Sequence, residues 1–147
     1  MAGNDLASAN VNRAYSLAAT TIAIFTFTLN IFYPRYKSGD IDPFLFQATL
    51  VVMGVATCCY LVASFLYYGV SIGGAFSDEG RARREATGAD GLWLLGTLLL
   101  FLAPSLILWT LGLTGVAAAW FVLWLIYIGV AIRQFPMIRR SRGQQSR

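Results

Sequence analysis

The sequence predicts an all-α integral membrane protein with four transmembrane helices arranged as two hairpins. Three long stretches, residues 14–34, 43–77 and 91–132, contain no charged side chain, and 57% of the chain is hydrophobic. Peptide groups in hydrocarbon must satisfy their hydrogen bonds internally, and continuous rather than alternating hydrophobicity favours helices over a barrel. Lipid is therefore the expected solvent for most of the chain.

The length of each stretch predicts where the helices lie. A helix needs about 20 apolar residues to cross roughly 30 Å of hydrocarbon. The first two stretches fit one span each, whereas the third is twice as long as a span and must turn. The two glycines of Leu111-Gly112-Leu113-Thr114-Gly115 favour a turn at that point. We predict one domain over 1–147, with helices at 14–33, 43–72, 91–111 and 115–133 and a basic tail at 134–147.

Residues at the predicted helix ends carry local signals. Pro34 is expected to close the first helix, and Asp42 followed by Pro43 is typical of an N-cap with proline at the first helical position. Asp90 is expected to cap the third helix in the same way. Asp40 and Asp42 make a poor cation site, because no histidine and no third acid lies nearby.

Basic residues predict the orientation, since short loops rich in Lys and Arg stay on the cytoplasmic side. Arg35 and Lys37 lie in the connection after the first helix, and the other nine of the eleven basic residues lie on the opposite side. We expect a multi-pass protein of the plasma membrane with both termini in the cytoplasm. The tail at 134–147 should also contact anionic lipid headgroups. Binding to nucleic acid is therefore not needed to explain the excess of basic residues.

A stripe of small and polar side chains follows the first two helices at alternating intervals of three and four residues. Such spacing keeps side chains on one helix face, where small residues allow close approach and polar ones can hydrogen-bond to another helix. We call this set the polar stripe; it comprises Ser16, Ala19, Ala23, Thr26 and Asn30 in the first helix and Gln47, Gly54, Thr57 and Ser64 in the second.

The polar stripe has two interpretations. The first is packing, within the bundle or between copies of the chain. The second is a water-filled passage for a small solute or ion, lined by Thr26, Asn30, Gln47 and Thr57. The spacing alone does not separate these two interpretations.

The second hairpin has a different composition, rich in leucine and tryptophan. Pro104 is expected to kink the third helix, with Ser105 helping to satisfy the freed carbonyls; a static kink is favoured over a gating hinge. Trp109, Trp120 and Trp124 are expected to anchor and pack this hairpin rather than to bind a cofactor.

The residue types present argue against an enzyme. The chain contains no histidine, which removes the commonest general base and metal ligand, and no acid or lysine lies within the predicted spans. Cys58 and Cys59 are adjacent rather than spaced as a redox pair, and we expect both to be buried. We therefore expect no catalytic residue, no cofactor and no metal site.

These observations favour a small non-enzymatic membrane protein that acts through helix contacts. It would be a self-associating or accessory subunit, whose partners are the lipid bilayer and either further copies of the chain or a larger membrane protein. The alternative is a small channel or passive facilitator. A lone four-helix bundle fills its own centre with side chains, so a channel would require several copies.

Overall fold

The chain folds into four long helices in a computed structural model, which confirms the predicted fold class. They are α1 (Ala2–Ser38), α2 (Pro43–Gly73), α3 (Glu79–Thr110) and α4 (Thr114–Gln144). Each contains a stretch long and apolar enough to cross a membrane. The structure describes the backbone over 2–73 and 79–144, and the side chains over 9–70 and 84–133.

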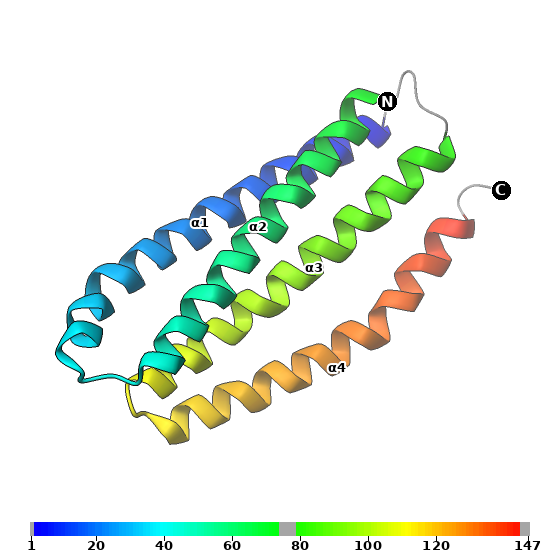
Figure 1. Cartoon of the computed structure of the whole chain (residues 1–147). Helices are drawn as coiled ribbons and strands as arrows, with labels where there is room; N and C mark the ends of the chain where they lie inside the picture. Colours follow the sequence, from blue (N-terminus) through cyan, green and yellow to red (C-terminus); the bar gives the residue numbers. More distant parts are fainter. Residues whose placement is uncertain (1, 74–78, 145–147) are drawn as a thin grey trace.

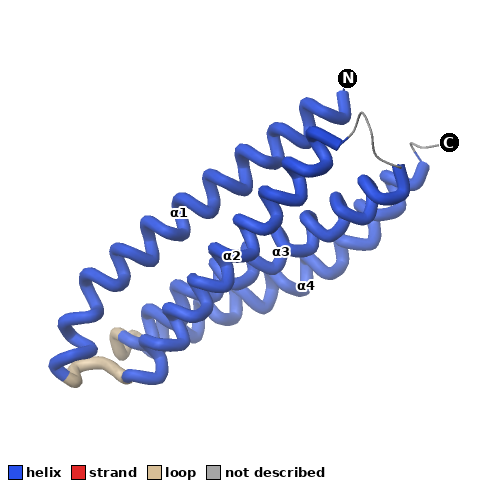
Figure 2. The backbone as a smooth tube through the Cα atoms, turned by 45° about the horizontal axis from the view of Figure 1, so that its top comes forward, coloured by secondary structure: helices blue, strands red, loops and turns tan. Residues whose placement is uncertain are grey.

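The helices pack in chain order as antiparallel neighbours (Figure 1). α2 and α3 share the most extensive interface, α1 packs against α2, and α4 packs mainly against α3. The same row is visible after rotation of the molecule (Figure 2). α1 begins and α4 ends at one end of the row, the terminal end; the opposite end, the short-loop end, carries the connections at 39–42 and 111–113.

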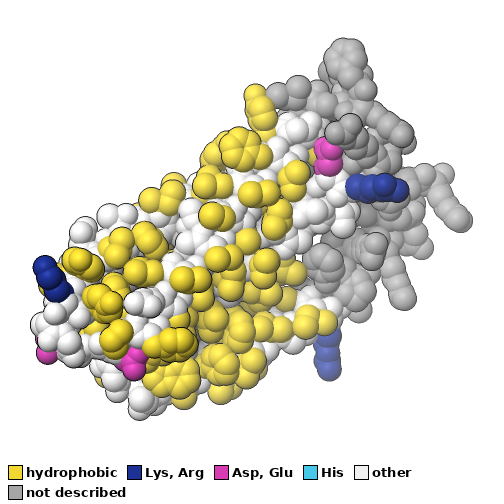
Figure 3. Space-filling model, in the orientation of Figure 1, with side chains coloured by type: hydrophobic (Ala, Val, Ile, Leu, Met, Phe, Trp, Pro, Cys, Tyr) yellow, Lys and Arg dark blue, Asp and Glu magenta, His cyan; other side chains and the backbone are white. Residues whose placement is uncertain are grey.

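Charged side chains lie at the two ends of the row. On the face shown in Figure 3, hydrophobic and uncharged side chains cover the middle, and Lys, Arg, Asp and Glu occur only near the ends. This distribution is expected when the middle of a bundle lies in hydrocarbon and its ends lie in the headgroup regions.

The two connections at the short-loop end use the same helix-ending geometry. Gly39 and Gly112 adopt positive φ angles of 82° and 74°, which glycine accepts without strain. The next amides, of Asp40 and Leu113, bond back to the carbonyls of Arg35 and Leu108, each at 3.0 Å. This is the Schellman motif, which satisfies carbonyls at the end of a helix and turns the chain towards the next one.

The predicted N-cap of α2 is confirmed. Asp42 Oδ1 accepts hydrogen bonds from the amides of Phe44 (2.8 Å) and Leu45 (3.1 Å). Two backbone donors at the start of α2 are thereby satisfied next to the membrane surface.

Two other expected helix ends are wrong. α1 continues through Pro34 to Ser38, since a proline in the last turns removes one hydrogen bond but does not force the chain out of the helix. α3 begins at Glu79, so Asp90 lies inside it rather than at its N-terminus. Its carboxylate instead accepts a 2.6 Å hydrogen bond from the Tyr67 hydroxyl of α2.

Small side chains fill most of the interior. Few large side chains are fully buried, and the chief ones are Tyr60 and Met53 of α2; the other buried positions are mainly alanines, with threonines and serines among them. Tyr60 donates a 3.2 Å hydrogen bond to the Thr97 hydroxyl of α3. Helix backbones can approach closely where side chains are small, which compensates for the absence of a hydrophobic driving force between helices in lipid.

α2 and α3 are in close contact at Gly96. A Cβ atom at this glycine would lie 3.2 Å from the Cys59 Cβ, 3.2 Å from the Tyr60 ring and 3.3 Å from the Ala56 carbonyl oxygen. By contrast, a Cβ atom at Gly54, on α2, would have no neighbour within 4 Å. The two helical glycines therefore have opposite roles: Gly96 permits a close contact, and Gly54 leaves a gap.

We predict that Gly96→Val destabilises the bundle by about 1–3 kcal/mol, because the added side chain must push α2 and α3 apart. Gly54→Ala is the matched control and should be neutral or stabilising by roughly 0.5 kcal/mol, since alanine favours the helix. Reversible unfolding in mixed micelles measures both. Equal stabilities for the two variants would contradict the close contact at Gly96.

Candidate functional site

The α1 part of the polar stripe lies on the outside of the molecule. Ser16, Ala19, Ala23, Thr26 and Asn30 are all exposed. The face of α1 that packs against the bundle carries instead five buried residues at the same kind of spacing, namely Ala14, Ala18, Thr21, Thr28 and Phe32. The two faces are offset by two residues, or about 200° around a helix.

The α2 part of the stripe is placed differently. Ser64 is fully buried and donates to the Leu61 carbonyl at 2.7 Å. Gly54 and Thr57 are half-buried, and Gln47 is exposed. The structure therefore does not bring the α1 and α2 parts of the polar stripe together, and they line no common passage inside one chain.

Hydroxyl groups on α1 are satisfied within the helix. Thr26 donates to the Ile22 carbonyl at 2.9 Å, and Thr20 donates to the Ser16 carbonyl at 2.9 Å. The side chain of Asn30, in contrast, makes no hydrogen bond with any residue that the structure describes. Its backbone carbonyl also lacks the usual donor, because the residue four positions later, Pro34, has no N–H. Unsatisfied polar groups thus gather at one turn of an outward face.

Pro104 in α3 creates the same defect, and α4 lies beside it. α3 stays helical from Glu79 to Thr110 through this proline. The indole of Trp120 donates to the Phe101 carbonyl at 2.9 Å, and that of Trp124 donates to the Leu98 carbonyl at 2.8 Å. Both tryptophans therefore bond to backbone carbonyls in the turns just before Pro104.

Ser105 does not act as expected. Its hydroxyl donates across the interface to the Ala117 carbonyl of α4 at 3.0 Å, rather than to a freed carbonyl of its own helix. Over the side chains that the structure describes, three side-chain hydrogen bonds thus join α3 to α4. The sequence predicted tryptophan packing but not these bonds, because only the position of α4 shows which carbonyls the indoles reach.

Groups with catalytic or metal-binding chemistry are sparse. Cys59 is buried as expected, whereas Cys58 is exposed, which corrects the expectation for this residue. Adjacent helical residues differ by about 100°, so only one of them can face α3. Among the described residues, no cluster of three or more His, Cys, Asp or Glu could hold a metal ion.

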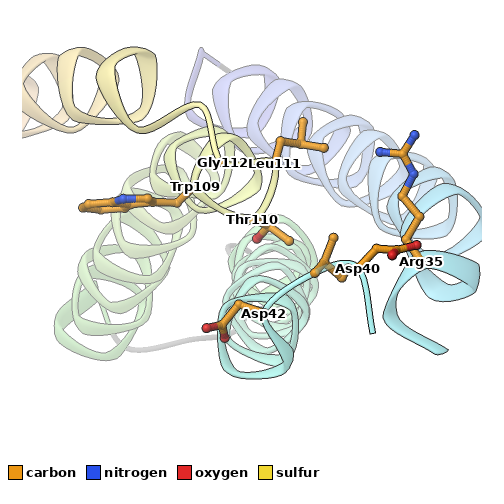
Figure 4. A pocket seen from close by; sticks show the side chains of 8 residues that line it. Arg35, Asp40, Asp42, Trp109, Thr110, Leu111 and Gly112 are labelled. Carbon is orange, nitrogen blue, oxygen red and sulfur yellow. The ribbon is translucent and has the colours of Figure 1, made fainter. Parts of the chain in front are cut away.

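A polar pocket of about 490 Å³ opens at the short-loop end. Arg35 lines it from the last turns of α1, residues 40–42 from the α1–α2 connection, and residues 109–112 from the end of α3 and the turn that follows it. Figure 4 shows the Arg35 guanidinium on the α1 side, with Thr110 and Leu111 opposite. The side chains of Asp42 and Trp109 point away from the pocket: Asp42 caps α2, and the Trp109 ring lies 6.4 Å from that of Phe121.

The basic tail is helical through Gln144, but the side chains of residues 134–147 lie outside those described. The predicted contact of this tail with anionic lipid headgroups therefore stays a prediction.

Comparison of the chain with protein-family models, curated proteins and solved structures finds no match.

Proposed function

We propose that the chain is a non-enzymatic membrane subunit that associates with a second copy of itself through the outward face of α1. The observation that carries the proposal is the exposure of the whole α1 part of the polar stripe, from Ser16 to Asn30. Apolar side chains are the favoured contacts for lipid, and polar ones in spans are mostly found against other helices. The absence of histidine from the sequence supports a non-enzymatic role.

The position of Asn30 in the bilayer supports another protein as the partner of this face. It lies five residues before Arg35, about 7.5 Å further into the bilayer along the helix. A carboxamide without a hydrogen-bond partner at that depth costs free energy, which a neighbouring helix can recover. Because Pro34 has no N–H, a backbone carbonyl at the same turn also lacks its usual hydrogen-bond donor.

The chemistry of the stripe favours an identical copy as the partner. In a dimer with its two-fold axis along the membrane normal, the two α1 helices run parallel, and each residue near the axis meets its own equivalent. A carboxamide both donates and accepts hydrogen bonds, so Asn30 is complementary to Asn30 of a second copy. Ala19 and Ala23 would let the two backbones approach.

The same outward face favours a second candidate, an oligomeric channel. In a ring of copies whose α1 helices point inward, Thr26 and Asn30 would line a central passage. No acid or lysine lies in the first span, so such a passage would be passive. The two candidates differ in what the stripe contacts: protein in the dimer, and water in the ring.

For the orientation, we propose that both termini face the cytoplasm of the plasma membrane, because nine of the eleven basic residues lie on that side. In a variant lacking Cys58 and Cys59, a cysteine at Ser38 should react with a membrane-impermeant maleimide in intact cells. A cysteine at Ala9 should react only after permeabilisation. Labelling of both from one side would contradict this topology.

We predict that Asn30→Leu weakens self-association about fivefold, since the loss of two reciprocal interhelical hydrogen bonds is worth roughly 1 kcal/mol. Ala23→Leu should weaken it further by separating the backbones. Ala119→Leu is the matched control, because Ala119 is an equally exposed alanine on α4. Single-molecule photobleaching in liposomes at several protein densities measures the dimer fraction. A monomer at every density, or equal effects of the two alanine variants, would overturn the proposal.

We predict no downhill flux of ions or small solutes through reconstituted protein, because the dimer buries the stripe. The measurement is ion or dye release from liposomes, with Asn30→Leu and Thr26→Val alongside the wild type. A flux that these substitutions alter would favour the ring. Accumulation against a gradient under a pH difference would contradict both candidates.

A further inference from the structure

We infer that the polar pocket at the short-loop end binds a phosphate–ammonium zwitterion of the kind that forms the headgroup of phosphatidylethanolamine. The pocket's volume of about 490 Å³ lies within the usual range for small-ligand sites. No residue of the polar stripe lines it, so its occupancy does not depend on self-association.

Three charged residues line the pocket; the Asp42 carboxylate caps α2 and points away, and the other two, Arg35 and Asp40, do not neutralise each other. Arg35 and Asp40 both line it, and no ion pair joins Arg35 to Asp40 or Asp42 in the part of the chain that the structure describes. Asp40 contacts the Ser38 hydroxyl at 2.5 Å, and Figure 4 shows the Arg35 guanidinium turned away from the Asp42 carboxylate. Arg35 and Asp40 are thus both left available to a ligand.

The charge pattern selects a zwitterion over a simple ion. An anion alone would meet Arg35 but would be repelled by Asp40 and by the negative ends of the α1 and α3 dipoles, which both end at this pocket. A cation alone would be attracted by Asp40 and by the same dipole ends, but it would be repelled by Arg35 and would leave the guanidinium without a partner. A phosphate at the guanidinium and an ammonium at the carboxylate give both charges a partner.

The groups around Asp40 favour a primary ammonium over a quaternary one. A carboxylate accepts hydrogen bonds from a primary ammonium, which a choline group cannot donate. Choline is instead held by aromatic faces, and the one aromatic ring of the lining, Trp109, points away from the pocket towards Phe121. Ethanolamine therefore fits this lining better than choline.

The position of the pocket makes lipid its natural source of ligand. The pocket lies where α1 and α3 end, and its lining includes Trp109, one of the tryptophans expected to anchor the second hairpin. Headgroups are concentrated at this depth. A free phosphoethanolamine carries the same chemistry and would satisfy the same side chains.

Native mass spectrometry of the full chain, titrated with phosphatidylethanolamine, phosphatidylcholine and phosphatidylglycerol of identical acyl chains, tests the pocket. We expect Arg35→Gln and Asp40→Asn each to lower the affinity for the ethanolamine lipid about fivefold. This is the size of effect expected when one hydrogen bond to a partly exposed charged group is lost. Binding of phosphatidylglycerol to the basic tail would not change with Asp40→Asn. The choline lipid should bind more weakly than the ethanolamine lipid and be insensitive to Asp40→Asn.

Two neighbouring substitutions are the controls. Lys37→Gln removes a positive charge from the same helix turn outside the lining, and Ser38→Ala removes the contact with Asp40. Both should leave ethanolamine-lipid binding unchanged, and circular dichroism checks that each variant is folded. Equal binding of the three lipids, or equal effects of Lys37→Gln and Arg35→Gln, would overturn the assignment.

Soluble O-phosphoethanolamine separates the two sources of the ligand. If it displaces the ethanolamine lipid from the wild type, the pocket accepts the free zwitterion. If it does not, while the lipid preference and the effects of Arg35→Gln and Asp40→Asn persist, the ligand is the lipid headgroup held with its acyl chains. Self-association measured on the same Arg35 and Asp40 variants should be unchanged, which keeps this test distinct from that of the dimer.

Discussion

Hydrocarbon offers no hydrogen-bond partner to a peptide group, and the two prolines inside helices show how this chain meets that constraint. Pro104 removes the donor of the Leu100 carbonyl, and the indoles of Trp120 and Trp124 donate to the neighbouring carbonyls of Phe101 and Leu98. At Pro34 the carbonyl of Asn30 loses its donor on a face of α1 that no other helix of the chain covers. The proline of the second hairpin thus lies where another helix packs and bonds, whereas that of the first hairpin lies on an exposed face.

Close backbone packing holds α1, α2 and α3 together, whereas specific hydrogen bonds hold α4. The span of α2 is 39% buried and that of α4 is 6% buried, so α4 contributes little packed surface. Without that surface, its attachment depends on the bonds from Ser105, Trp120 and Trp124. These bonds form in a medium where the alternative is an unsatisfied hydroxyl or indole N–H, which makes them effective at a sparsely packed interface.

Continuous hydrophobicity was enough to predict four spans, and the local chemistry of Asp42 and Gly112 placed two of the helix boundaries. The buried face of α1 was not predictable in the same way, because the faces containing Thr26 and Thr28 have the same spacing and similar composition. Threonine hydroxyls bond back to their own helix, as Thr28 does to the Ile24 carbonyl at 2.8 Å, so a buried threonine needs no partner on another helix. Polarity alone therefore does not reveal which face is buried. The pocket was also not predictable, since it brings together residues 35 and 110 from the ends of two separate helices, α1 and α3.

The two edges of the helix row differ in chemistry, and this difference bears on how copies can assemble. α4 presents mainly large apolar side chains such as Leu123 (58% exposed) and Ile126 (58% exposed), which suit lipid, whereas α1 presents the polar stripe. A two-fold dimer removes that stripe from lipid with one self-complementary contact and then has no second polar edge with which to continue. A ring would leave the stripe in water and would need further contact faces on both sides of α1, where Ile22 and Phe27 are exposed apolar residues. The dimer therefore requires fewer surfaces than the ring and uses the polar one directly.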